Sequence, residues 1–116
     1  MTTQRIVVGA HYGLRDWMAQ RITAVIIALY SVILLVAVLM LPERSYGAWA
    51  SLFSGGFMKV TTLLAMLSLI YHAWIGVRDI FMDYVKPTWL RLSLYVATIV
   101  LLIAYVLWSV MILWSV

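Results

Sequence analysis

Three long stretches of the chain carry no charged side chain. They cover residues 22–41, 60–77 and 92–116, and the charged residues lie before and between them. A helix that crosses about 30 Å of hydrocarbon needs about 20 mostly apolar residues, and it satisfies its own backbone hydrogen bonds on the way. The pattern therefore predicts an all-α membrane protein with three transmembrane helices, forming a single membrane domain over residues 1–116.

The segments that flank these stretches predict the connections. Residues 42–58 predict the outer loop, with glycines at positions 47, 55 and 56 as turn points. The second helix is expected to extend beyond Val77 and to end before Pro87, because proline biases Lys86 away from helical geometry. The first stretch is longer than a signal-peptide core and no small-residue cleavage site follows it, so we expect it to remain in place.

Composition excludes several classes of protein. Apolar residues make up 66% of the chain and charged residues only 10%, too few to cover the surface of a water-soluble domain. The chain has no cysteine, which excludes disulfide scaffolds, thiolate metal sites and cysteine nucleophiles. Chemistry must therefore come from its few acidic, histidine and tyrosine side chains.

The net charge of +4 reflects membrane topology and gives no indication of nucleic-acid binding. Two basic residues, Arg44 and Lys59, lie on one side of the predicted spans. Six lie on the other side: Arg5, Arg15, Arg21, Arg78, Lys86 and Arg91. By the positive-inside rule, the amino terminus is expected to be cytoplasmic and the carboxyl terminus periplasmic.

One histidine, His72, lies inside a predicted span. An ionisable residue in a membrane is costly unless it is neutral and partnered, so it marks a candidate functional site. Small residues at positions 61, 65, 68 and 76 share its helix face, and Ser68 could accept a hydrogen bond from the imidazole. Such a face permits close approach either of another helix or of a planar cofactor such as haem, and both interpretations remain open.

A haem held by two histidines would need a ligand from outside this chain. His11, the other histidine, lies in the polar segment before the first span. The second ligand must then come from another protein or from a second copy of this one, which predicts an assembly.

A second polar cluster follows His72 towards the end of the same helix. Tyr84 offers a hydroxyl donor, and Asp79 and Asp83 offer carboxylates that can exchange protons with the cytoplasm. Reduction of a quinone needs both functions where lipid and water meet. Tyrosines and charged residues also populate every membrane interface, so spacing alone favours the structural interpretation.

The residues of these two clusters resemble a known family. The stretch His72-Ala-Trp-Ile-Gly-Val-Arg-Asp-Ile-Phe-Met-Asp-Tyr-Val-Lys-Pro87 is similar to the signature of the small hydrophobic anchor subunit of proteobacterial succinate dehydrogenase, respiratory complex II. The similarity continues through Phe57-Met-Lys-Val-Thr-Thr-Leu-Leu-Ala and Arg21-Ile-Thr-Ala-Val, and so covers essentially the whole chain.

This resemblance implies roles for individual residues. His72 would be one axial ligand of a b-type haem, and a partner C subunit would supply the other. Tyr84 would donate a hydrogen bond to the ubiquinone head group, with Asp83 as its acidic neighbour. Arg21 would pair with a haem propionate. The chain departs from the family pattern at Arg15, where a histidine is expected.

The resemblance also implies the larger reaction. A flavoprotein subunit would oxidise succinate, an iron-sulfur subunit would carry the electrons, and ubiquinone would be reduced beside this anchor in the bacterial inner membrane. The chain itself would be a non-catalytic, multi-pass subunit. Three alternatives remain: an anchor of fumarate reductase, a small multidrug transporter, which would need a carboxylate inside a span, and an assembly factor without cofactor.

Overall fold

The structure is a computed structural model that describes residues 13–116. It contains four helices in the order α1 (Gly13–Leu39), α2 (Tyr46–Ser54), α3 (Gly56–Tyr84) and α4 (Thr88–Trp114). The expectations about Arg5 and His11 lie outside the described residues. Within residues 13–116 every regular element is a helix, so the prediction of an all-helical protein is confirmed.

Three of the helices are long enough to cross a membrane. α1 and α4 have 27 residues each and α3 has 29, and all three have the length and composition of membrane spans. At 1.5 Å per residue each helix is about 40 Å long, which exceeds the hydrocarbon thickness of about 30 Å. The prediction of three candidate membrane-spanning helices is therefore confirmed.

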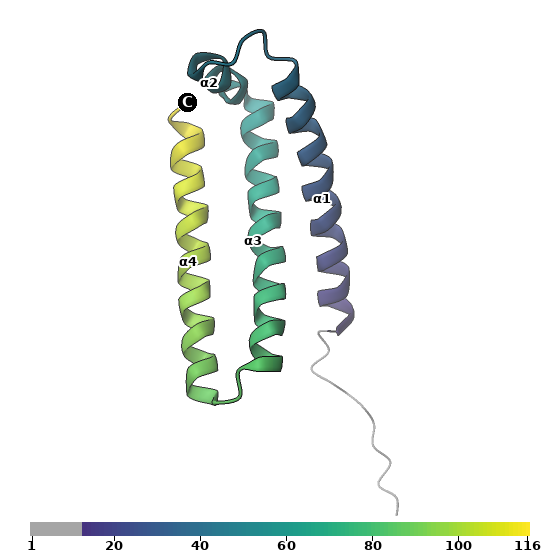
Figure 1. The fold of residues 1–116 in the computed structure, drawn as a ribbon, viewed down its shortest axis with the longest axis vertical. Coiled ribbons are helices and arrows are strands. Elements are labelled where there is room, and N and C mark those ends of the chain that lie inside the picture. The colour runs from purple at the N-terminus through teal and green to yellow at the C-terminus, as the bar shows by residue number, and fades with distance from the viewer. Residues whose placement is uncertain (1–12) are drawn as a thin grey trace, which may run out of the picture.

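The long helices run side by side, with α3 between α1 and α4 (Figure 1). Each long helix is antiparallel to the long helix that follows it in the chain (Figure 1). α3 ends at Tyr84, where the N–H of Val85 still donates to the carbonyl of Phe81 at 3.0 Å, and α4 begins directly after Pro87. The proline ends the extension of α3 as its sequence position predicts, since it cannot continue the helical hydrogen bonds.

The connection between α1 and α3 corrects one prediction. Residues 42–58 were expected to form a loop with turn points at its glycines, but they contain the nine-residue helix α2. Ser45 caps this helix, because its Oγ accepts a hydrogen bond from the N–H of Ala48 at 3.2 Å. Phe53 is buried together with Met58 and Leu113, so apolar packing against the ends of α3 and α4 stabilises a helix too short to persist alone.

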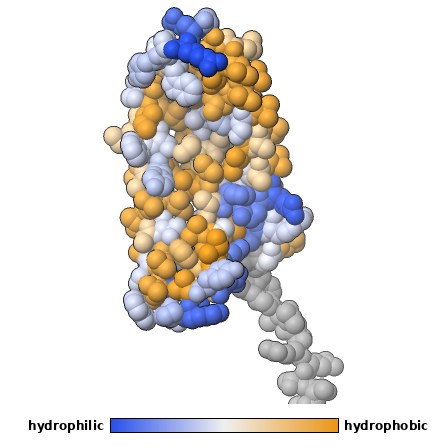
Figure 2. Space-filling model, in the orientation of Figure 1, coloured by the Kyte–Doolittle hydropathy of each residue, from blue (hydrophilic) through white to orange (hydrophobic). Residues whose placement is uncertain are grey.

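Most large apolar side chains of the three long helices are exposed on the isolated chain. Hydrophilic residues gather towards the two ends of the molecule, with apolar surface between them (Figure 2). An apolar surface of this extent is stable against lipid or against partner helices, and not against water.

Candidate functional site

His72 lies on the face of α3 that packs against α1. Its Nδ1 lies 3.0 Å from the hydroxyl oxygen of Thr23, a buried residue of α1. The Thr23 hydroxyl donates its proton to the carbonyl of Ala19 at 2.6 Å, one turn earlier in α1. With that proton donated to Ala19, the hydroxyl accepts from the Nδ1–H tautomer of His72, and this tautomer leaves the Nε2 lone pair available for a ligand.

An open cleft of about 520 Å³ lies between α1 and α3 beside His72. The α1 residues that line it recur at intervals of three and four, so they form one face of that helix. The lining residues are Gly13, Asp16, Trp17, Gln20, Arg21 and Ala24 from α1, with His72, Ile75 and Asp79 from α3. Three of the residues singled out in the sequence, His72, Arg21 and Asp79, therefore share one cleft.

Arg21 lies over the ring of Trp17, with its guanidinium carbon 5.2 Å from the ring centroid. Both side chains are exposed on the isolated chain, so the cleft can be reached from outside. The cation–π contact holds a positive charge at this edge without neutralising it. The cleft thus combines a metal-binding nitrogen with a cation suited to an anionic ligand.

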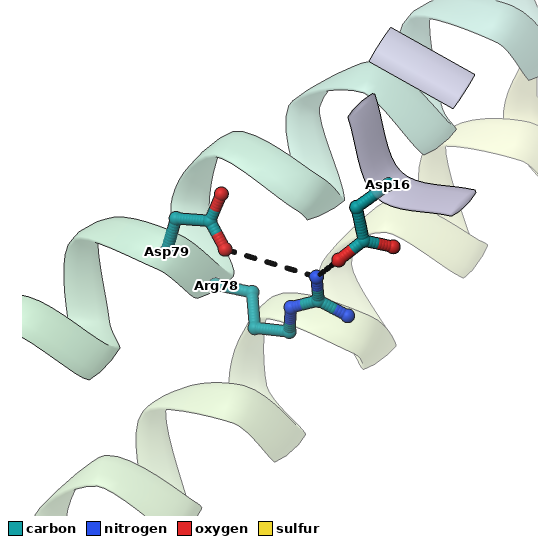
Figure 3. A network of polar contacts seen from close by, with 3 residues as sticks. All are labelled: Asp16, Arg78 and Asp79. Carbon is teal, nitrogen blue, oxygen red and sulfur yellow. Dashed lines mark hydrogen bonds and ion pairs between the residues drawn. The ribbon is translucent and has the colours of Figure 1, made fainter. Parts of the chain in front are cut away.

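A network of charged side chains includes Asp16 and Asp79, two residues that line the cleft. Arg78 of α3 forms an ion pair with Asp16 of α1, and its Nη2 also lies 3.7 Å from Oδ1 of Asp79 (Figure 3). Two further atoms of this region, Oε1 of Gln20 and Nε of Arg78, are buried without a hydrogen-bond partner among residues 13–116. Buried polar atoms are ordinarily hydrogen-bonded, so these two remain free to bind a water or a group outside the described chain.

α1 packs against the stripe of small residues around His72. Ala65 and Ser68 are buried, and a Cβ atom added at Gly76 would lie 4.0 Å from Nε2 of Gln20, which is ordinary van der Waals contact. Helix packing therefore accounts for the stripe, and a ligand would occupy the cleft beside it.

Asp83 and Tyr84 lie apart from this cleft, at the last turn of α3. Both are exposed, and neither is among the described residues that line the cleft. Tyr84 follows His72 by twelve residues, or about 18 Å along the helix axis, and points about 120° away from it. Asp83 lies on nearly the same helix face as His72, three turns further on. The chain alone thus presents two separate groups of candidate residues.

The sequence pattern did not indicate two residues that form contacts at this site. Thr23 takes the role that was considered for Ser68, and Arg78 was counted only as a basic residue of the predicted cytoplasmic side. Thr23 and Asp16 lie seven residues apart in α1. A polar stripe at this spacing is the signal that could have indicated which face of α1 meets α3.

Comparisons with known proteins identify the family of this chain. The family model of the succinate dehydrogenase/fumarate reductase transmembrane subunit matches residues 1–112. A relative from Coxiella burnetii, described as a succinate dehydrogenase hydrophobic membrane anchor subunit, is 43% identical over 102 residues, which cover 88% of this chain and 89% of the relative. With its three apolar helices, the protein is a multi-pass inner-membrane protein. The chain belongs to the family of succinate dehydrogenase/fumarate reductase transmembrane subunits and is a membrane anchor of that family.

Proposed function

We propose that this chain is the membrane anchor of a succinate:ubiquinone oxidoreductase, in which His72 is one axial ligand of a shared b-type haem. The observation that carries this proposal is the hydrogen bond between His72 and Thr23. Histidines that bind metals donate their second N–H to a neighbouring acceptor, which orients the ring and directs the other nitrogen at the metal. Nδ1 of His72 is engaged in this way, and Nε2 remains for iron.

The other residues of the cleft fit the same group. A haem carries two propionates, and Arg21 supplies a cation at the edge of the cleft that holds His72. When bound, a b-type haem supplies one-electron transfer and stores charge beside the quinone site. This chain orients the imidazole through Thr23, offers Arg21 to a propionate and closes one side of the cleft with Trp17.

The second axial histidine comes from a partner. His72 is the one histidine within the three predicted spans, and the C-type anchor subunit implied by the family resemblance is the proposed source of the other. The same assembly would include an iron-sulfur subunit and a flavoprotein subunit, where succinate is oxidised. Extensive exposed apolar surface on α1 and α4 supports docking against further membrane helices.

Tyr84 and Asp83 are the proposed contribution to ubiquinone reduction. Tyr84 is 79% exposed at the end of α3, so its hydroxyl is free to donate to a quinone carbonyl in a site completed by partner subunits. Asp83 is exposed beside it and can take up protons from water. The separation from His72 supports a quinone site distinct from the haem cleft.

The proposed orientation places the cleft and Tyr84 at the cytoplasmic side. Basic residues of the described chain gather at this end of the three helices: Arg15, Arg21, Arg78, Lys86 and Arg91. Because the chain has no cysteine, Ser115→Cys introduces a single thiol at the opposite end. We expect a membrane-impermeant maleimide to label this thiol from the periplasm, and labelling only from the cytoplasm would reverse the orientation.

The family model includes fumarate reductases, whose anchors would serve the reverse reaction with menaquinol. The relative from Coxiella burnetii favours succinate dehydrogenase, and quinone preference of the purified complex distinguishes the two. A small multidrug transporter is disfavoured, because Asp and Glu are absent from residues 22–41, 60–77 and 92–116.

The deciding experiment is an absorption spectrum of the purified complex with its co-purifying subunits identified. We expect a low-spin b-type spectrum that His72→Ala abolishes or strongly weakens, because the iron loses a ligand. His11→Ala is the matched control and should retain the spectrum. A wild-type spectrum in the His72→Ala complex would assign this histidine to helix packing with Thr23 instead.

A further inference from the structure

Polar contacts link α1 to α3 at regular intervals along α1. Each joins one side chain of α1 to one of α3, and the pairs are Asp16–Arg78, Thr23–His72 and Tyr30–Thr62. Successive α1 members lie seven residues apart, which is close to two helical turns, so they occupy one stripe. Their α3 partners recede by six and then ten residues, and this reversed order is that of an antiparallel pair.

All three contacts depend on the register of α1 against α3. Moving α1 by one residue would shift its side chains by about 1.5 Å and rotate them by about 100°, which takes each member of the stripe away from its partner. Thr23–His72 and Tyr30–Thr62 are hydrogen bonds between side chains and act only at hydrogen-bond distance. Asp16–Arg78 is a charge-assisted contact, which is stronger than a hydrogen bond between uncharged groups and can therefore select the register.

Arg78 is well suited to this selection. Its guanidinium is planar and offers five N–H donors, and Asp79 of the same helix holds it on one side. The side chains of Arg78 and Asp16 are only 25% and 22% exposed, so water and salt screen their ion pair less than a fully exposed one. In Figure 3 the guanidinium lies between Asp79 and the Asp16 carboxylate on the neighbouring helix.

We propose that Arg78 is a positioning residue whose ion pair with Asp16 holds α1 in the register at which Thr23 meets His72. The register follows from contacts within this chain. Its effect on haem rests on the function proposed above, because Thr23 reaches a ligand only if His72 binds iron. Arg78 itself then acts through α1 and Thr23, without contacting the haem.

Spin labels measure the register directly, without haem. The chain has no cysteine, so Leu14→Cys and Met82→Cys place two labels on exposed positions of α1 and α3 in the full chain in lipid nanodiscs. We expect one narrow distance distribution. In Arg78→Gln or Asp16→Asn it should broaden, or its maximum should shift by about 5 Å, the length of one helical turn.

Three further variants test whether the ion pair itself is responsible. Asp16→Glu retains the carboxylate and should restore the narrow distribution. The double variant Asp16→Asn with Arg78→Gln should perturb the distribution no more than either single change, because both remove the same contact. Lys86→Gln removes an exposed positive charge after α3 and should have no effect. An unchanged distribution in Arg78→Gln, or a broad one in the labelled chain without further changes, overturns the proposal.

The assembled complex gives the second readout. Arg78→Gln should shift the haem midpoint potential and the electron paramagnetic resonance signal in the same direction as Thr23→Val, while the label distances change in parallel. If the distances change but the haem signal does not, Thr23 does not depend on this register and the proposal fails. If His72→Ala retains the haem, the proposed function fails, and the label distances still decide the role of Arg78.

Discussion

Replacing Thr23 with valine tests the hydrogen bond on which the haem proposal depends. Valine has nearly the shape of threonine and is also β-branched, so α1 should keep its conformation and its packing. The change removes the acceptor that lies 3.0 Å from Nδ1 of His72. Thr23 is only 9% exposed, so water is largely excluded from the position of the lost hydroxyl.

The expected loss of haem affinity follows from three ranges of free energy. Leaving a buried donor unpaired costs about 1–3 kcal/mol, whereas interhelical hydrogen bonds in membranes contribute about 0.6 kcal/mol on average and at most about 1.7. Loss of a group that orients a metal ligand weakens metal binding by about 10- to 100-fold, equivalent to about 1.4–2.7 kcal/mol. The ranges overlap near 1.5 kcal/mol, so we expect haem to bind about tenfold more weakly.

The assay compares haem content per complex, and haem dissociation under mild detergent, between Thr23→Val and the unmutated complex. Thr61→Val is the matched control, because the Thr61 hydroxyl donates to the carbonyl of Phe57 in its own helix at 2.8 Å. The control should retain haem as the unmutated complex does. If both variants retain haem equally, Thr23 does not orient His72, and our explanation of its free Nε2 is wrong.

Three further predictions concern other contacts. Tyr84→Phe should leave folding and haem intact but lower the rate of quinone reduction by up to about 100-fold, or about 3 kcal/mol, if chemistry limits the rate. Succinate oxidation measured with a soluble dye should stay unchanged. A normal rate of quinone reduction would refute the role of Tyr84 as a hydrogen-bond donor. Arg21→Gln should weaken haem retention while the distance between labels on α1 and α3 stays constant, as measured in the complex. Tyr30→Phe removes the 2.6 Å contact with Thr62 and should destabilise the α1–α3 pair by about 1 kcal/mol in an unfolding titration, with no change in the haem spectrum.

The sequence by itself determined the membrane architecture. Uncharged stretches of about the length of a bilayer crossing are stable in a membrane as helices, because only a helix satisfies all of its backbone groups within a single segment. Pro87 determined where α3 ends, and the isolated position of His72 in an apolar segment marked it as a candidate site. These conclusions depend only on local composition and spacing. They do not depend on which faces of the helices pack together.

Only the tertiary structure decided which side chains surround the candidate residues. Thr23 and Asp16 meet His72 and Arg78 because one particular stripe of α1 packs against α3, and an apolar helix with few polar residues gives little indication of that stripe. α2 exists because Phe53 packs on the ends of two distant helices. In each case the deciding interaction joins residues that are remote in sequence, so local pattern does not contain it.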